Sequence, residues 1–159
     1  NAPPVPRHAR GGLVAFSDST ILEALAAHYT AATPPSGETL KKAFAYPPDG
    51  LNATPAIVLY PGSDSVSYGA ANRQVSLAVA ATLYLPLVEY ARNYARTAAW
   101  REYMRDSMLD AVQLNGTSGV SQVSVTGTVV DSSEYGDAPF ITITANIQVI
   151  GVEVISPSA

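Results

Sequence analysis

The residue types that carry out chemistry are sparse in this chain, and they do not cluster. There are two histidines, His8 and His28, and there is no cysteine. Disulfides and thiolate metal sites are therefore excluded, and the histidines form no H-E-x-x-H pattern. His28 falls within a predicted helix, where an ordinary helix residue is expected in preference to a ligand. We expect neither a metal nor a cofactor.

Nucleophile and phosphate motifs are also missing. The nearest approach to G-x-S-x-G is the segment SVSYG at 65–69, which lacks the first glycine and precedes a predicted strand instead of a helix. No glycine-rich phosphate loop occurs. The carboxylates Asp131, Glu134 and Asp137 fall within one turn-rich segment, where a solvated hairpin tip is expected. The sequence predicts that the protein is not an enzyme, and a small enzyme or ligand-binding domain is the less favoured alternative.

The first half of the chain contains one predicted helix and four predicted strands, the shortest of which lies around Val66–Tyr68 between two predicted turns in 61–72. The helix begins near a capping-box pattern at Thr20–Glu23, with Asp18 and Ser19 as rival caps, and TPPSG at 33–37 ends it. The alternating segment 40–46 predicts a short strand, with a helical turn as the alternative. Prolines at 47, 48, 55 and 61 are expected to confine a buried strand to 56–60. Strict alternation from 73 to 85 predicts a long strand with one face in the core. The expected buried face of the helix comprises Ile21, Leu22, Leu25, Ala26 and Tyr29.

Residues 87–114 predict one long helix, whose apolar residues do not form a single stripe. Arg101 and Arg105 fall within the stripe made by the first half, while Trp100, Tyr103 and Met104 face elsewhere. Either the helix kinks near residue 100, or its second half buries another face against a second molecule. These five residues are therefore candidates for a subunit or partner interface.

The last segment predicts two strands, near 123–129 and at 140–155, joined by a hairpin loop at 131–139. In the final strand the apolar positions change parity, and Ile150, Val152 and Val154 lie opposite the earlier set. A bulge near Gly151 accounts for the change, as does a strand end covered by a partner. These three residues are further interface candidates.

The order of elements predicts an α+β domain: a mostly antiparallel sheet with an N-terminal helix and one long helix packed on it. Residues 1–18 are expected to form an extended arm and 19–159 a single domain. The net charge of −4 gives no basic footprint for nucleic acid. No apolar run approaches the roughly 18 residues that span a bilayer, so no membrane partner is expected.

The segment AYPPDGLNATPAIVLYPGSDSVSYGAANRQVSLAVAATLYLP resembles the neck and tail proteins of long-tailed bacteriophages, above all tail terminators. The likeness extends over about residues 19–155 and consists of the order of elements around the YPPDG…PAIVLYPG corner. The length and arginine content of the 87–114 helix depart from the pattern, which leaves the position within the neck open.

The resemblance implies a virion protein, assembled in the host cytoplasm, that forms a ring, typically a hexamer, without a cofactor. Its partners would be the tail-tube protein and the head–tail connector, with DNA passing through the lumen without specific binding. The alternative is another neck or tail component: a head-completion protein, a connector adaptor or a tail-tube relative. Candidate contacts near predicted turns are Asp64, Tyr68, Glu134, Tyr135 and Asp137.

Overall fold

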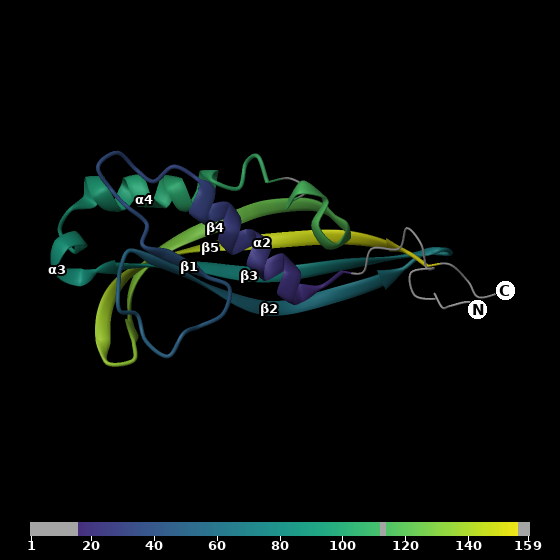
Figure 1. Cartoon of the computed structure of the whole chain (residues 1–159), viewed down its shortest axis with the longest axis horizontal. Helices are drawn as coiled ribbons and strands as arrows, with labels where there is room; N and C mark the ends of the chain where they lie inside the picture. Colours follow the sequence, from purple (N-terminus) through teal and green to yellow (C-terminus); the bar gives the residue numbers. More distant parts are fainter. Residues whose placement is uncertain (1–15, 112–113, 156–159) are drawn as a thin grey trace, which may run out of the picture.

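A five-stranded sheet forms the body of the domain in a computed structural model that describes residues 16–111 and 114–155 (Figure 1). The spatial order of the strands is β1-β2-β3-β5-β4. β1 runs parallel to β2, and the other neighbours are antiparallel. The predicted α+β class with a mostly antiparallel sheet is confirmed. The strands are β1 (Lys42–Phe44), β2 (Ala56–Tyr68), β3 (Asn72–Pro86), β4 (Val120–Tyr135) and β5 (Ala138–Val154).

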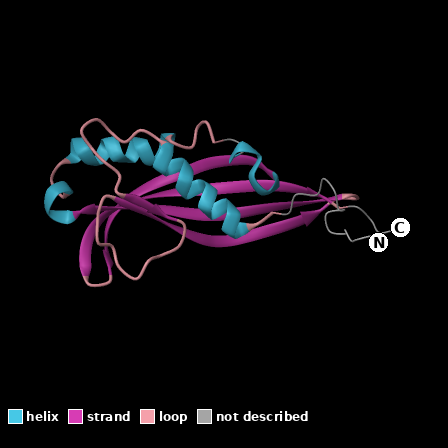
Figure 2. Cartoon of the chain, viewed as in Figure 1, coloured by secondary structure: helices cyan, strands magenta, loops and turns pink. Residues whose placement is uncertain are grey.

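Helices cover one face of this sheet, as Figure 2 shows for the oblique crossing of α2 over the strands. They are α2 (Asp18–Ala31), α3 (Leu87–Tyr90), α4 (Tyr94–Asp106) and the short 3₁₀ helix η1 (Leu114–Gly119). The predicted apolar face of α2 is buried, as are the alternate residues of β3 from Val75 to Leu85. Burial of these two apolar sets against each other produces the main core.

The N-terminal boundary differs from the prediction. Helix α2 begins at Asp18, and its cap is Ser17, whose Oγ accepts a hydrogen bond from the Thr20 N–H at 3.3 Å. The cap assignment to residues 18–20 is therefore wrong. Phe16 already packs against the core, so the domain includes residues that were assigned to the arm. Residues 1–15 of the predicted arm lie outside the described residues.

The single helix predicted for 87–114 is wrong, because the chain breaks it. Helix α3 ends at Tyr90, and Asn93 caps a new helix by accepting a hydrogen bond from the Arg96 N–H at 3.1 Å. An asparagine side chain competes for backbone donors and therefore favours a helix start over a helix interior. The break gives the two segments different axes, so one helical projection cannot describe both.

The strands predicted for 56–60 and around Val66–Tyr68 form one strand, because β2 continues through Pro61 to Tyr68. The tight turn predicted between them is wrong. β1 pairs with β2 only up to Phe44–Val58. Beyond that point β2 is an edge strand in the described part of the chain, and a proline on an edge costs no sheet hydrogen bond when its nitrogen faces outward. A register shift between Pro61 and Asp64 marks the irregularity that accompanies this proline.

The predicted loop at 131–139 is wrong in extent. β4 continues to Tyr135 and pairs with Ala138 across a two-residue turn of Gly136 and Asp137. Gly136 has φ of +63°, the left-handed conformation that two-residue hairpins require. The polar composition of DSSEY reflects the solvent exposure of paired strands and not a loop.

β5 has no bulge at Gly151 in its pairing with β3, where the register is continuous from Asn72–Val154 to Pro86–Phe140. The irregularity lies in β4, where the register shifts between Val120 and Gln122. Gly151 and Glu153 occupy the next two inward positions of β5 after Val149. The remaining apolar residues near the strand end therefore face outward.

Candidate interaction surfaces

Three of the predicted interface residues belong to the chain's own core. Trp100 and Met104 are 0% exposed, and Tyr103 is buried. The Tyr103 hydroxyl donates to the backbone oxygen of Tyr29 on α2, and its ring lies 5.2 Å from that of Trp100. The assignment of these three to a subunit interface is therefore wrong: the break at Asn93 turns this face of α4 toward the sheet.

The two arginines beside them are exposed. Arg101 reaches from α4 to β4, where its Nε donates to Thr128 Oγ1 at 2.8 Å and its Nη2 to the Thr128 backbone oxygen at 3.1 Å. Arg105 pairs with the adjacent Asp106 at 2.9 Å. Arg101 thus lies at the outermost strand of the sheet, where a neighbouring molecule could reach it.

The remaining predicted contact residues lie near the two ends of the sheet. Asp64 and Tyr68 are exposed in β2, while Val152 and Val154 are exposed and Ile150 half-buried near the end of β5. Glu134 and Asp137 are exposed at the β4–β5 hairpin. The structure therefore separates these candidates into two groups and does not gather them into one site.

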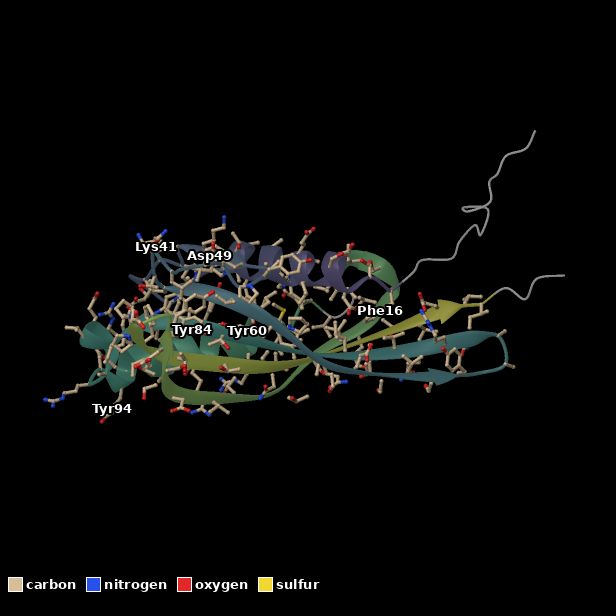
Figure 3. All side chains as sticks on the ribbon, turned by 90° about the horizontal axis from the view of Figure 1, so that it is seen from below. Phe16, Lys41, Asp49, Tyr60, Tyr84 and Tyr94 are labelled. Atoms are coloured by element: carbon tan, nitrogen blue, oxygen red, sulfur yellow. The ribbon has the colours of Figure 1, made fainter. Side chains whose placement is uncertain are left out.

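The helix-free face of the sheet carries a second, smaller core near that hairpin. Val58, Tyr84 and Phe140 are buried there, and the Tyr60 and Tyr84 hydroxyls lie 2.8 Å apart (Figure 3). Burial raises the pKa of Tyr84 above its ordinary value.

The predicted corner contributes to this smaller core. Leu51 packs against it, and the Tyr135 hydroxyl donates to the backbone oxygen of Pro48. The YPPDG corner therefore covers one end of the sheet's second face.

A partly buried ionic cluster was not predicted from the sequence. The Glu38 side chain, 10% exposed, accepts hydrogen bonds from Arg96 Nε at 2.7 Å, from the Tyr90 hydroxyl at 2.5 Å and from Trp100 Nε1 at 3.3 Å. Arg96 is the largest cause that lowers the pKa of Glu38, to about 2. Glu38 follows a Pro/Ser/Gly turn, and no local pattern links it to a helix that begins far along the chain.

A second carboxylate is buried at the opposite end of the sheet. Glu153 on β5 binds Arg73 on β3 and accepts a hydrogen bond from the backbone N–H of Phe16 at 2.7 Å. The Phe16 ring packs directly above Gly151. These contacts hold the start of the described chain against β5.

A surface groove of about 850 Å³ lies between the end of α2 and α4. His28 Nε2 lies 2.9 Å from the Ser107 backbone oxygen and 3.1 Å from Asp110 Oδ1. Glu102 and Asp106 also line the groove. His28 thus contacts the turn after α4, which agrees with its assignment as a structural helix residue.

We call the part of the sheet's helix-free surface that extends away from the β4–β5 hairpin the open face. It consists of five cross-strand rows of residues on that side, from the row of Val58, which is itself buried in the smaller core, to the row of Ser67. None of these strand positions holds a charged residue. The rows are Val58-Thr82-Thr144-Val129, Tyr60-Ala80-Asn146-Gly127, Ala78-Gln148-Ser124, Ser65-Ser76-Ile150-Gln122 and Ser67-Gln74-Val152.

The sheet has two unlike edges among the described residues. One is β4, which pairs only with β5, and the other is the part of β2 beyond Val58. On β4 the side chains of Val129 and Val130 are 52% and 39% exposed. Unpaired edge strands offer backbone donors and acceptors to another chain. The edges are therefore the most evident surfaces for association.

Comparison with known proteins gives no family assignment: no protein-family model matches the chain, and no curated protein matches it. Within residues 16–111 and 114–155, no group of three or more histidine or acidic side chains is arranged to hold a metal ion. No helix in the same residues is long and apolar enough to cross a bilayer.

Proposed function

We propose that this chain is a structural protein of a long-tailed phage virion, a tail terminator that caps the tail tube as a homo-oligomeric ring and joins it to the head connector. The observation that carries the proposal is a sheet with two unlike free edges among the described residues and an open face whose strand positions hold no charged residue. Contact between unlike edges of successive copies is heterologous, and such contacts generate rings when the rotation closes.

The open face suits the inside of such a ring. With the sheet continued from copy to copy, the helices lie on the other surface and the Ser, Thr, Asn and Gln side chains line the lumen. Arginine and lysine bind phosphates strongly, and these rows contain neither. DNA would therefore pass without stable contacts. A hexamer is the size that the family resemblance implies.

The alternative within the same class is another neck or tail component, namely a head-completion protein, a connector adaptor or a tail-tube relative. The edges and the open face support each of these about equally. Locating the chain within the virion, at the head–tail junction or along the tube, separates them.

Electron microscopy of the purified protein, together with mass spectrometry of purified virions, tests the proposal. We expect rings of one size with a central hole, and the chain among the virion proteins. A protein that stays monomeric at high concentration and is absent from virions would overturn the proposal.

A further inference from the structure

We propose that successive copies associate by antiparallel pairing of the β4 edge of one copy with residues 59–68 of β2 in the next, and that Arg101 of one copy binds Asp64 of the next. The inference rests on the proposed ring function and specifies its interface.

The β4 edge lacks the usual protection against pairing. Residues 120–135 contain no lysine, arginine or proline, the residues that commonly prevent edge-to-edge contact. After the register shift at 125–127, pairing with β5 is regular from Gly127 to Tyr135. Val129 and Val130 face opposite sides of this regular stretch, and both are exposed. An added strand would cover parts of both.

The β2 edge is also exposed, and within 59–68 only Pro61 cannot donate a backbone hydrogen bond to an added strand. Every residue from Pro61 to Tyr68 is exposed, and Val66 and Tyr68 face the helix-covered side because they pair with Val75 and Arg73. Val130 of β4 faces the same side, since it pairs with the buried Ile143. An added strand at either edge would cover part of these apolar side chains.

Strand direction also favours this pair. β2 is antiparallel to β3, β3 to β5, and β5 to β4, so β2 and β4 of one copy run in opposite directions. Rotation about a ring axis keeps the direction of each strand along that axis. The β2 strand of the next copy therefore meets β4 in the antiparallel arrangement.

The charges at the two edges are complementary. Asp64 is the only charged residue in 59–68, and it faces the helix-covered side because it pairs with Leu77, whose side chain is buried there. Arg101 lies at the outer strand on the same side, bound to Thr128. In a separate copy the Arg101 guanidinium donates to the Thr128 backbone oxygen at the sheet edge. In the ring it also binds the Asp64 carboxylate of the next copy.

This contact requires successive copies to be staggered. Asp64 lies in the row of Leu77 and Val149, whereas Thr128 pairs with Ala145, four residues along β5. Four residues correspond to about 13 Å along a strand. Closed sheets need a stagger of this kind between their strands.

Charge exchange tests the ion pair in the full-length protein. We expect Arg101→Asp and Asp64→Arg each to raise the concentration needed for ring formation by about tenfold or more, as loss of a charge pair in an interface does. The double variant should recover most of the loss. Arg105→Asp is the matched control on the same helix and should leave assembly near wild type. Failure of the double variant to recover would overturn the ion pair.

Cysteine cross-linking tests the strand pairing without background, because the chain has no cysteine. Asp64 and Thr128 of one copy are separated by three strand spacings, about 14 Å, so a disulfide within one copy is ruled out. Oxidised Asp64→Cys/Thr128→Cys protein should give a ladder of linked copies up to the ring. The control Ser65→Cys/Thr128→Cys should not, because Ser65 faces the open face.

Each outcome separates the interface from the function. Rings that form normally, give no ladder and ignore the charge exchange would overturn the pairing and leave the ring proposal intact. Thr128→Cys alone giving only linked dimers would show a two-fold β4–β4 contact and also overturn the pairing. A strictly monomeric protein absent from virions would remove the proposed function itself.

Discussion

Arg96 Nε on α4 lies 2.7 Å from Glu38 Oε2 in the loop before β1, and this ion pair ties the loop to the helix layer. The Tyr90 hydroxyl and Trp100 Nε1 donate to the same carboxylate. Because the carboxylate is largely buried, its removal leaves several donors without a partner.

Replacing this carboxylate should therefore destabilise the domain. Glu38→Gln keeps the size of the side chain but loses the charge, and we expect the free energy of unfolding to fall by about 2 kcal/mol, the scale of hydrogen bonds to charged groups. Urea denaturation measures the loss. The exposed Glu102→Gln is the matched control, and a loss equal to that of the control would contradict the role of the pair.

The same pair should make stability depend on pH below neutrality. The pKa of Glu38 is lowered from 4.5 to about 2, so the folded state holds this proton less readily than the unfolded state does. Its stabilising contribution is complete above the unfolded pKa and is lost as the pH falls toward the folded one.

The difference in unfolding free energy between wild type and Glu38→Gln isolates this carboxylate from the others. It should be constant above about pH 5.5 and should shrink steadily toward about pH 2. Unfolding curves of both proteins at several pH values provide the measurement. A difference that does not change over this range would argue against the lowered pKa.

The sequence predicted most of the fold because the relevant signals are local. Alternation in β3 and the apolar face of α2 are periodic patterns, and both are confirmed by burial. The break at Asn93 was missed because the apolar spacing continues past it. The extension of β2 through Pro61 was missed because it depends on where β1 ends, which is a property of the assembled sheet.

The candidate surfaces were less predictable because they depend on which residues the sheet leaves uncovered. Trp100 and Met104 lie outside the helical stripe of the first segment. Their positions correctly indicated that the second segment buries a different face, but this face packs on the chain's own core and not on a second molecule. Arg101 falls within that stripe, an unusual position for a charged residue. Its contact with Thr128 on β4 follows from the pairing order of the strands, which no short pattern in the sequence encodes.

The close approach of Phe16 to Gly151 should make this glycine sensitive to substitution. A Cβ at residue 151 would overlap Cδ2 of the Phe16 ring and would lie 3.1 Å from the backbone oxygen of Gly119. We expect Gly151→Ala to lower the free energy of unfolding by about 1 to 2 kcal/mol through overpacking.

A double-mutant cycle identifies the cause of that loss. In the background of Phe16→Ala the Gly151→Ala change should cost much less, because the ring that it meets is gone. Thermal unfolding of the four proteins gives the coupling. Additive losses would mean that the contact with Gly119, and not the ring, limits the space.

The two roles of α4 should separate by mutation. Trp100→Ala should lower stability by about 4 kcal/mol, the cost of emptying a large core site. Arg101→Ala should change stability by less than about 1 kcal/mol, because its contacts are at the surface. Chemical denaturation measures both. Small losses for both variants would return Trp100 to the list of interface candidates.

The proposed ring predicts that a positive charge on the open face impairs DNA passage while leaving the fold intact. Asn146 is exposed in the middle of β5 and faces outward opposite Ala80, so Asn146→Lys should change the free energy of unfolding by no more than about 0.5 kcal/mol. In a ring every copy would present this lysine to the DNA phosphates, and the attraction would weaken with salt. We expect slower DNA ejection from virions that carry the variant, with recovery as the salt concentration rises.

Asn146→Gln is the neutral control, and virions that carry it should eject DNA at the wild-type rate. Equal ejection rates for the lysine and glutamine variants at low salt would mean that this face does not line the DNA path.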